Sequence, residues 1–307
     1  MARRPKTALY FTTVVVLEKN LAVLGGHLYQ EKAEPTITRP VVCRGEEWGA
    51  LDDIDDVVYA ATKKPSPLAG GRPTLCQMGR MGNYRETISG KPPVETEVDI
   101  VDAGYLMDLR YIGRHLYACG IQNIIYRQVD RRWQRMDHGI FSPIGDEVDR
   151  TLESIDGFAD DDIYAVGDGG AIWHWNGNCW TRLDSPTNMP LYCVLCSSSG
   201  DVYIGGSGGV LLKGREGKGW ADLSDPSVKV EVFEDMTEFK GRIYMTATDL
   251  LLSTDGKSIE QVDVPIKGEK SYYAIDSVAD ALWCVGDDCV LQFDGKKWNR
   301  YICPDNV

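Results

Sequence analysis

The chain has 307 residues, of which 43% are hydrophobic, and its 46 acidic side chains outnumber its 33 basic ones for a net charge of −13. This hydrophobic content excludes an intrinsically disordered protein and allows a large buried core. The negative charge argues against nucleic acid and anionic membrane as partners, because both attract a cationic surface, whereas it suits a basic protein.

The segment from residue 8 to residue 44 predicts a divergent unit of four strands. The expected strands are Tyr10–Leu17, Leu21–Leu24, His27–Gln30 and Thr38–Cys43. The basic start and the following apolar stretch imitate a secretory signal, but no small-x-small cleavage site follows, and the β-branched residues Val14–Val16 favour a buried strand. We therefore expect a cytoplasmic protein, with the periplasm as the alternative.

A repeat of about forty residues follows, and it is clearest in Asp162–Asp184. There Ile163–Val166 and Ala171–Trp175 predict two short strands separated by a glycine-rich turn. Asn176-Gly177 is the dipeptide that best accepts positive φ in a hairpin, so Cys179–Leu183 is expected to return as a further strand. With one more strand ahead of it, the unit has four strands.

Two residue positions mark this repeat along the chain. The aromatic residue expected in the second strand falls at Tyr59, Tyr117, Tyr164, Tyr203, Tyr244 and Trp283. The residue expected to open the fourth strand falls at Tyr84, Trp133, Trp180, Trp220, Ile259 and Trp298. The last three steps are 39, 41 and 39 residues in the first series and 40, 39 and 39 in the second. Such a step, with four strands per unit, is typical of propeller blades.

We predict an all-β fold in which residues 1–307 form a single β-propeller domain with seven blades of four antiparallel strands. The blades are expected at about 8–44, 45–88, 103–137, 151–184, 190–224, 230–263 and 271–303. Six blades with an N-terminal appendage are the alternative. The last blade is complete in sequence, so ring closure is expected to depend on packing against the first blade and not on an exchanged strand.

The segment Ile163–Leu183 resembles the repeats of a broad group of bacterial β-propellers with neuraminidase-type (BNR) or WD-like repeats. They include the sialidase-type and the photosystem-assembly-type propellers, and the resemblance covers residues 105–303. It implies the fold. It implies no particular activity, because such propellers serve as scaffolds, binding proteins and enzymes. The sialidase turn Ser-x-Asp-x-Gly-x-x-Trp is not met at Ser253–Gly256, so no functional residue is carried over.

The sequence offers no catalytic, cofactor-binding or metal-binding set. The four histidines, His27, His115, His138 and His174, have no ligand neighbour at helix or finger spacing. Cys193 and Cys196 would point to opposite faces of a strand. The nine cysteines are irregularly spaced, which favours a reducing compartment over a disulfide framework. We therefore predict a protein that is not an enzyme and needs no cofactor or metal.

Three long insertions predict a binding surface, because loops carry function more often than the scaffold does. Thr62–Pro73 is expected between the second and third strands of its blade, and Ser89–Asp102 and Asp137–Thr151 between blades, which would place all three on one face. The candidate partner-binding residues are Arg72, Glu95, Glu97, Asp99, Asp102, Phe141, Ile144, Asp146, Glu147 and Asp149. Phe141 and Ile144 would be apolar anchors within an acidic surface.

These features favour a non-catalytic propeller that binds another protein of basic character and is monomeric when free. The concrete hypothesis is a bacterial immunity-type inhibitor that neutralises a basic toxin through the acidic loop face. One alternative is a glycoside-acting enzyme at the mouth of the propeller channel, which would need a pair of carboxylates. The other is an assembly factor for a larger complex.

Overall fold

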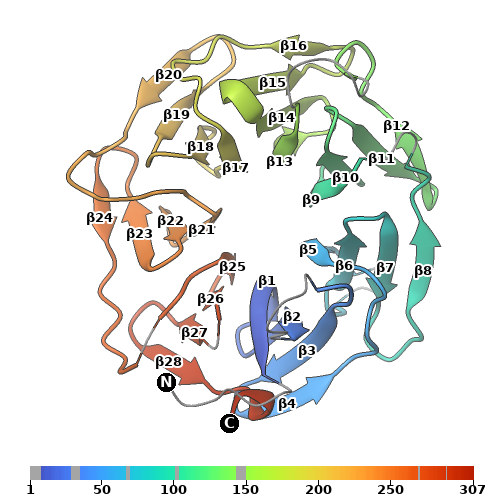
Figure 1. Cartoon of the computed structure of the whole chain (residues 1–307), viewed down its shortest axis with the longest axis vertical. Helices are drawn as coiled ribbons and strands as arrows, with labels where there is room; N and C mark the ends of the chain where they lie inside the picture. The colour runs from blue at the N-terminus through green and yellow to red at the C-terminus, as the bar shows by residue number, and fades with distance from the viewer. Residues whose placement is uncertain are drawn as a thin grey trace.

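The computed structural model describes residues 8–28, 35–66, 70–100, 104–142, 150–268, 270–287 and 289–307. Over these ranges the chain forms seven antiparallel sheets of four strands, arranged as blades in a ring (Figure 1), which confirms the predicted seven-bladed all-β propeller. The helices in the same ranges are two short 3-10 turns, η1 (Asp168–Gly170) and η2 (Pro304–Asn306). None of the described helices is long and apolar enough to cross a membrane.

The first three blades follow the chain in order, each made of four consecutive strands. Blade 1 comprises β1 (Leu9–Glu18), β2 (Leu21–Leu28), β3 (Arg39–Arg44) and β4 (Glu47–Ala50). Blade 2 comprises β5 (Val58–Lys64), β6 (Thr74–Gly79), β7 (Asn83–Thr87) and β8 (Val94–Glu97). Blade 3 comprises β9 (Leu106–Ile112), β10 (His115–Gly120), β11 (Ile125–Val129) and β12 (Arg132–Arg135).

The last four blades are more regular in length. Blade 4 comprises β13 (Leu152–Ala159), β14 (Asp162–Gly167), β15 (Ala171–Trp175) and β16 (Trp180–Arg182). Blade 5 comprises β17 (Leu191–Cys196), β18 (Val202–Gly206), β19 (Leu211–Arg215) and β20 (Gly219–Asp222). Blade 6 comprises β21 (Asp235–Phe239), β22 (Arg242–Ala247), β23 (Leu250–Thr254) and β24 (Ile259–Gln261). Blade 7 comprises β25 (Ala274–Val278), β26 (Ala281–Val285), β27 (Val290–Phe293) and β28 (Trp298–Tyr301).

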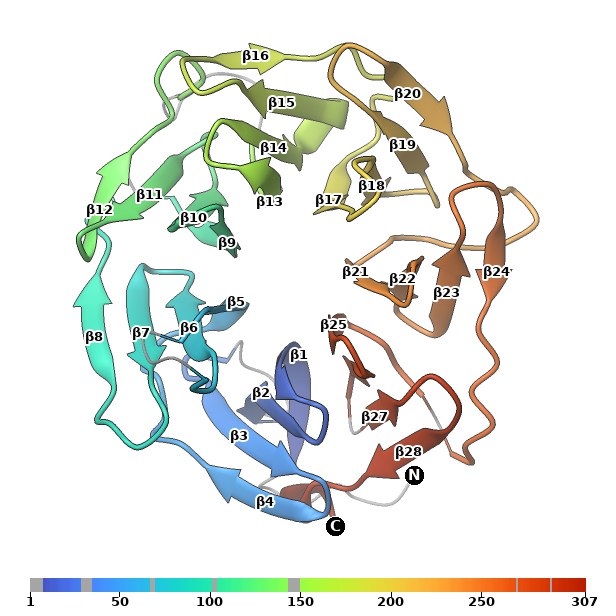
Figure 2. The ribbon, with the colours of Figure 1, turned by 180° about the vertical axis from the view of Figure 1, so that it is seen from behind.

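In every blade the first strand lies nearest the centre and the fourth lies at the rim (Figures 1 and 2). Because consecutive strands are antiparallel, the turns after the first and third strands lie on one face of the ring, which we call the hairpin face. The turns after the second strands and the connections between blades lie on the opposite face, which we call the crossover face. These two faces decide which loops can act together.

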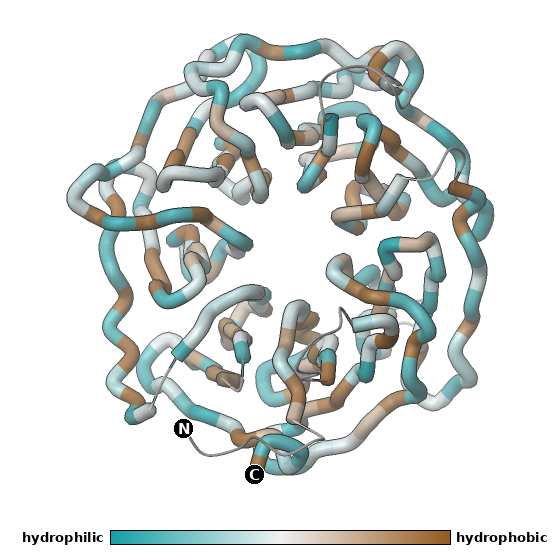
Figure 3. Tube along the Cα trace, in the orientation of Figure 1, coloured by the Kyte–Doolittle hydropathy of each residue, from teal (hydrophilic) through white to brown (hydrophobic). Residues whose placement is uncertain are grey.

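The core lies between neighbouring blades. Tyr117 on β10, for example, is fully buried and packs in one cluster with Ile155 and Ile163 of the next blade. Hydrophobic residues occur in all seven blades (Figure 3), and inner strands such as β6 and β14 are buried along almost their whole length, on both faces of their sheets. A blade therefore exposes two apolar faces that only its neighbours can cover.

The two sequence markers are confirmed for blades 3 to 7. The second-strand aromatics Tyr117, Tyr164, Tyr203, Tyr244 and Trp283 lie in β10, β14, β18, β22 and β26, and the fourth-strand markers from Trp133 to Trp298 lie in β12, β16, β20, β24 and β28. Both predictions are wrong for blade 2. Tyr59 lies in the first strand and Tyr84 in the third, because the second strand, β6, has no aromatic residue and follows a long connection.

The predicted strands of blade 1 also need correction. His27 belongs to the second strand, which continues through Gly25 and Gly26, and the fourth strand is Glu47–Ala50 instead of Thr38–Cys43. The two glycines lie within the strand because the backbone there packs closely against its neighbours, and a Cβ on Gly25 would clash with the Thr13 hydroxyl oxygen. Trp48, which lies in β4, is therefore the true fourth-strand aromatic of this blade.

A common turn joins the third and fourth strands in blades 4, 6 and 7. Asn176, Asp255 and Asp294 each accept two backbone N–H groups of the turn on their side-chain oxygen, and the glycine that follows each of them has φ between 86° and 93°. Only glycine adopts this backbone conformation without strain, so the Asx-Gly pairs fix the hairpins. The same N–H groups lower the pKa of the Asp255 and Asp294 carboxyls.

Ring closure joins blade 7 to blade 1 without an exchanged strand, as predicted, since each sheet consists of consecutive strands. Leu9, Phe11 and Val16 pack in one cluster with Trp283 and other residues of blade 7. The Asn306 side chain accepts the N–H of Leu9 at 2.7 Å and donates to its carbonyl at 3.0 Å. The C-terminal turn thus fastens the start of the first strand.

Candidate binding site at the channel mouth

The first strands of all seven blades line a central cavity of about 360 Å³. Their side chains alternate, so that one set packs between the blades and the other points into the channel. On β1, for instance, Leu9 and Phe11 are fully buried while Tyr10 between them is partly exposed. Register shifts near the starts of several first strands, β13 among them, interrupt this alternation, so the neighbouring residues Glu153 and Ser154 both line the cavity.

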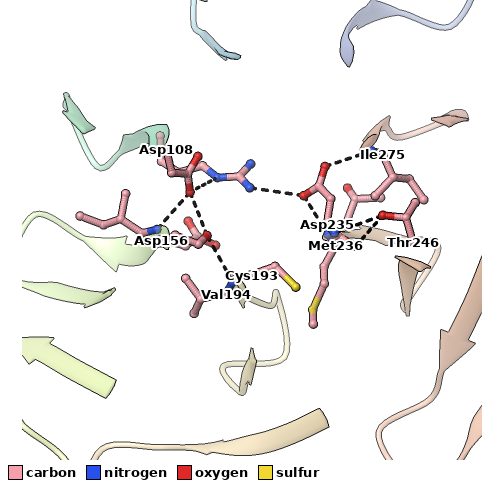
Figure 4. A network of polar contacts seen from close by, with 12 residues as sticks. Asp108, Asp156, Cys193, Val194, Asp235, Met236, Thr246 and Ile275 are labelled. Atoms are coloured by element: carbon pink, nitrogen blue, oxygen red, sulfur yellow. Dashed lines mark hydrogen bonds and ion pairs between the residues drawn. The ribbon is translucent and has the colours of Figure 1, made fainter. Parts of the chain in front are cut away.

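Within the channel, Arg110 of β9 reaches from blade 3 to Asp235 of blade 6. Figure 4 shows Asp235 and Asp108, the two partners of Arg110, on opposite sides of this network. Its guanidinium lies 3.5 Å from Asp108 on its own strand and 3.7 Å from Asp235 on β21 of blade 6. Asp108, and then Asp235, Asp156 and Asp276, raise the pKa of Arg110, while burial opposes them. A second channel cation, Lys63, donates to Asp276 at 2.6 Å.

The channel carboxylates also connect neighbouring blades. Asp108 accepts the backbone N–H of Ile155 at 3.0 Å, and Asp235 accepts that of Ile275 at 3.0 Å. Deeper along the strands, Asp156 accepts the N–H of Cys196 and Asp276 that of Val16, both at 2.7 Å. Each bond joins the first strand of one blade to the first strand of the next. These carboxylates therefore hold the ring together.

At the crossover face, one residue from the start of each first strand surrounds the channel opening. Together they form what we call the mouth ring: Tyr10, Tyr59, Met107, Glu153, Tyr192, Glu234 and Tyr273, taken from blades 1 to 7 in order. All but Tyr10 line the cavity. Glu153 and Glu234 flank Tyr192, and three tyrosines lie on the other side of the ring.

The acidic side of the mouth ring holds two carboxyl groups whose pKa values are raised. Burial, and then the charge of Asp168, raises the pKa of the Glu153 carboxyl to about 7. Burial also raises the pKa of Glu234, whose carboxylate accepts a hydrogen bond from the Thr248 hydroxyl at 3.3 Å. Neither glutamate has a cationic partner among the residues that the structure describes. A cation at the mouth would stabilise both carboxylates.

The aromatic side of the mouth ring is built on a buried histidine. The His27 ring is 5.3 Å from the Tyr10 ring and 5.7 Å from the Tyr59 ring, centroid to centroid. Burial lowers the pKa of His27, and its ring nitrogens bond to the Thr12 hydroxyl and the Ile37 carbonyl. The Tyr273 hydroxyl donates to Asp287 at 3.3 Å. Tyr59 is 43% exposed, so an aromatic face is available to solvent.

The described members of the predicted partner-binding set do not gather at one place. Arg72 lies in the connection from β5 to β6 on the hairpin face, where it pairs with Glu18. Glu95 and Glu97 lie on the rim strand β8, and Glu95 pairs with Arg85 at 2.6 Å. The prediction that the three insertions share one face is wrong. The first begins within β5 and continues into the connection after this first strand, and the second contains the strand β8 instead of being a connection between blades.

Two predicted residues do lie on the crossover face. Asp99 follows β8, and its backbone carbonyl accepts the Tyr126 hydroxyl at 3.1 Å. Phe141 follows β12, and the Arg135 guanidinium lies 4.3 Å from the centre of its ring. The remaining predicted residues, Asp102, Ile144, Asp146, Glu147 and Asp149, lie outside the described residues. Their role in binding stays a prediction.

The mouth ring itself was not found from the sequence. Its members recur once per blade, but their side chains are tyrosine, methionine or glutamate, so no single residue type reveals the period. The available signal was the alignment of the first strands, in which Met107, Glu153 and Tyr192 each follow the leucine that opens the strand. The constant step of the repeat is instead carried by residues of the second and fourth strands.

The fold and the channel define a seven-bladed β-propeller protein with a polar central cavity. No protein-family model matches the chain. Over 185 residues it is 31% identical to the immune protein Tsi7 of Pseudomonas aeruginosa, which covers 60% of this chain and 60% of that protein. The chain thus matches less than two thirds of that relative's length.

Solved structures of other propellers share the fold. YCF48 bound to a D1 peptide has a TM-score of 0.67 at 16% identity, covering 97% of this chain and 93% of that one. Virginiamycin B lyase from Staphylococcus aureus has a TM-score of 0.65 at 13% identity, covering 92% of both chains. The WD40 propeller domain of Doa1 has a TM-score of 0.68 at 8% identity, covering 95% and 96%. These proteins support the fold alone.

Proposed function

We propose that this chain is a non-catalytic, immunity-type protein that binds a basic toxin through its crossover face. The observation that carries the proposal is the 31% identity to the immune protein Tsi7 over 185 residues. The acidic channel mouth is the candidate binding site, because Glu153 and Glu234 lie there without a cationic partner from the described part of the chain.

Charge and exposed apolar groups support the crossover face as the docking surface. The net charge of −13 favours association with a basic partner. Tyr59, Met81, Tyr105 and Met189 are among the large hydrophobic side chains that are exposed, and all four belong to connections or strand starts on this face. Exposed apolar anchors beside complementary charge are the usual composition of a protein interface.

The hydrogen bonds of the channel carboxylates favour a binding role over a catalytic one. Asp108, Asp156, Asp235 and Asp276 each accept a backbone N–H from the next blade, so their positions are set by ring assembly. Arg110 and Lys63 neutralise three of them. A pair of carboxylates acting on a glycosidic bond would have to change partners and protonation during the reaction.

Cytoplasmic location and a monomeric free state belong to the same proposal. Nine cysteines without the spacing of a disulfide framework suit a reducing compartment, and seven of them are buried free thiols. Cell fractionation and light scattering of the purified protein measure the two properties directly. Recovery in the periplasm or as a stable dimer would contradict them.

The proposal is tested by purifying the tagged chain from cells of its native host and identifying what remains bound. The expected result is a one-to-one complex with a basic protein whose own activity the chain inhibits. An assembly factor would instead be recovered with subunits of a larger complex. If no protein is recovered even after crosslinking, or if the recovered protein keeps its activity in the complex, the proposal is wrong.

One observation favours a second candidate, a glycoside-acting enzyme at the channel mouth. A carboxyl with a pKa near 7 beside a second carboxylate, as for Glu153 and Asp168, is the arrangement of a general acid and its partner. Asp168 is, however, held by the backbone N–H of Thr151 at 2.9 Å. Hydrolysis of a panel of glycosides that is abolished by Glu153→Gln would favour the enzyme over the immunity protein.

A further inference from the structure

We propose that the mouth ring accepts one cationic side chain, an arginine or a lysine, that a partner protein inserts into the channel. This proposal rests on the proposed function, because it requires that the partner be a protein. It assigns a recognition role to seven residues that share one structural position, one per blade.

The mouth ring combines aromatic and acidic side chains. Four of its seven members are tyrosines, two are glutamates and one is a methionine. Aromatic faces attract ammonium and guanidinium groups through their quadrupole, and carboxylates attract them through charge. A ring that combines both around one opening suits a cation better than it suits an anion or an apolar group. A cavity of about 360 Å³ lies within the range of pockets that enclose small groups.

Three of the channel carboxylates already have cationic partners within the chain. Deeper in the channel, Arg110 is the partner of Asp108 and Asp235, and Lys63 is the partner of Asp276. At the ring, Glu153 and Glu234 have no such partner in the described part of the chain. The position for a further cation is therefore at the mouth, above the level that Arg110 occupies.

The reach of an inserted side chain is limited by Arg110. Its guanidinium pairs with Asp108 and Asp235, which directly follow Met107 and Glu234 of the ring, so its charge lies about one residue, or about 3.3 Å along the strand, beyond the ring. Its positive charge repels a second cation that approaches from above. The channel thus limits insertion to the head group of one long side chain, which suits arginine or lysine presented on a protein surface.

Exposed hydrophobic side chains lie on the same face as the mouth. Met81 in the turn from β6 to β7 is 60% exposed, and Tyr105 just before β9 is 40% exposed. Both belong to the crossover face next to the blades that carry Tyr59 and Met107. Arg80 lies over the Tyr105 ring at 4.9 Å. A protein that places a cation in the mouth can cover these side chains at the same time, whereas a free small cation cannot.

The test uses the full chain and synthetic peptides of twelve residues that differ only at one central position. That position is arginine, lysine or citrulline, the neutral analogue of arginine, and spermidine serves as the free cation. Binding is measured by calorimetry at pH 8. We expect the arginine and lysine peptides to bind at least about tenfold more tightly than the citrulline peptide. Spermidine should bind less tightly than either cationic peptide.

The matched variants are E153Q/E234Q in the mouth ring and E47Q/E216Q outside it. Both pairs remove the same two charges, and Glu47 and Glu216 are exposed on the rim strand β4 and on the hairpin face. The first pair should lose about tenfold or more in affinity for the arginine peptide, and the second should lose less than about twofold. Circular dichroism confirms that both variants are folded.

Equal binding of the arginine and citrulline peptides, no binding of either, or equal losses in the two variants would overturn the proposal. Tighter binding of spermidine than of the peptides would contradict a protein-borne ligand. These outcomes are separate from the fate of the immunity function. If a toxin is captured equally by wild type and E153Q/E234Q, the mouth proposal fails and the proposed function stands. If the peptides bind but no toxin is found, the mouth proposal stands and the proposed function fails.

Discussion

Arg110 of blade 3 and Asp235 of blade 6 lie 3.7 Å apart and form an ion pair that spans the central channel. Asp235 also receives the backbone N–H of Ile275 in blade 7, and Asp108, the other partner of Arg110, receives that of Ile155 in blade 4. One guanidinium thus connects blades on opposite sides of the ring through carboxylates that also bond their neighbours.

Replacing Arg110 with methionine should destabilise the protein by about 1.5–3 kcal/mol, because two partly buried carboxylates lose their cation. The free energy of unfolding from urea titration measures the loss. Arg132→Met, at an exposed position of β12, is the control and should change it by less than about 0.5 kcal/mol.

The same variant should respond to pH in a definite direction. Burial already raises the pKa of Asp235 to about 6, with Arg110 opposing the rise. Without Arg110 the pKa rises further, so the folded state favours the protonated acid, and stability is lost as pH increases through that pKa. The variant should be closest to wild type near pH 5 and weakest near pH 8. A constant difference across this range would contradict the assigned pairing.

Asn306 fastens the start of β1 to the C-terminal turn, and Asn306→Ala should weaken ring closure. The variant loses two hydrogen bonds to Leu9, which is expected to cost about 1–2 kcal/mol of stability. Hydrogen exchange should increase first in β1, because this strand closes the ring. Asn178→Ala, in an exposed turn of blade 4, should leave exchange in β1 unchanged. Equal exchange in the two variants would show that packing alone closes the ring.

Glu153→Gln should stabilise the free protein at pH 8 by about 1–3 kcal/mol while removing a binding group. Burial and then the charge of Asp168 raise the pKa of the Glu153 carboxyl. The Glu153 pKa is raised from 4.5 to about 7, so wild-type stability falls as pH rises from about 4.5 through 7. The variant should lack this fall. Thermal unfolding between pH 5 and pH 8 measures it, and parallel curves for the two proteins would contradict the assignment.

The sequence was sufficient to predict the propeller because second-strand aromatics such as Tyr164 and Trp283 must fill the space between blades, and this requirement recurs at a constant step. The prediction failed at Tyr59, where a long connection after β5 shifts the step. Channel residues are not under the same packing requirement. Glu153 and Tyr192 occupy equivalent places with different chemistry, so periodicity alone could not reveal the mouth ring.

In the proposed function, the chain neutralises a basic toxin by holding one of its cationic side chains in the mouth ring. The most direct measurement is the growth of cells that express the captured protein together with wild-type chain, E153Q/E234Q or E47Q/E216Q. We predict that wild type and E47Q/E216Q restore growth and that E153Q/E234Q does not. Failure of the wild-type chain to restore growth, or full rescue by E153Q/E234Q, would contradict this account.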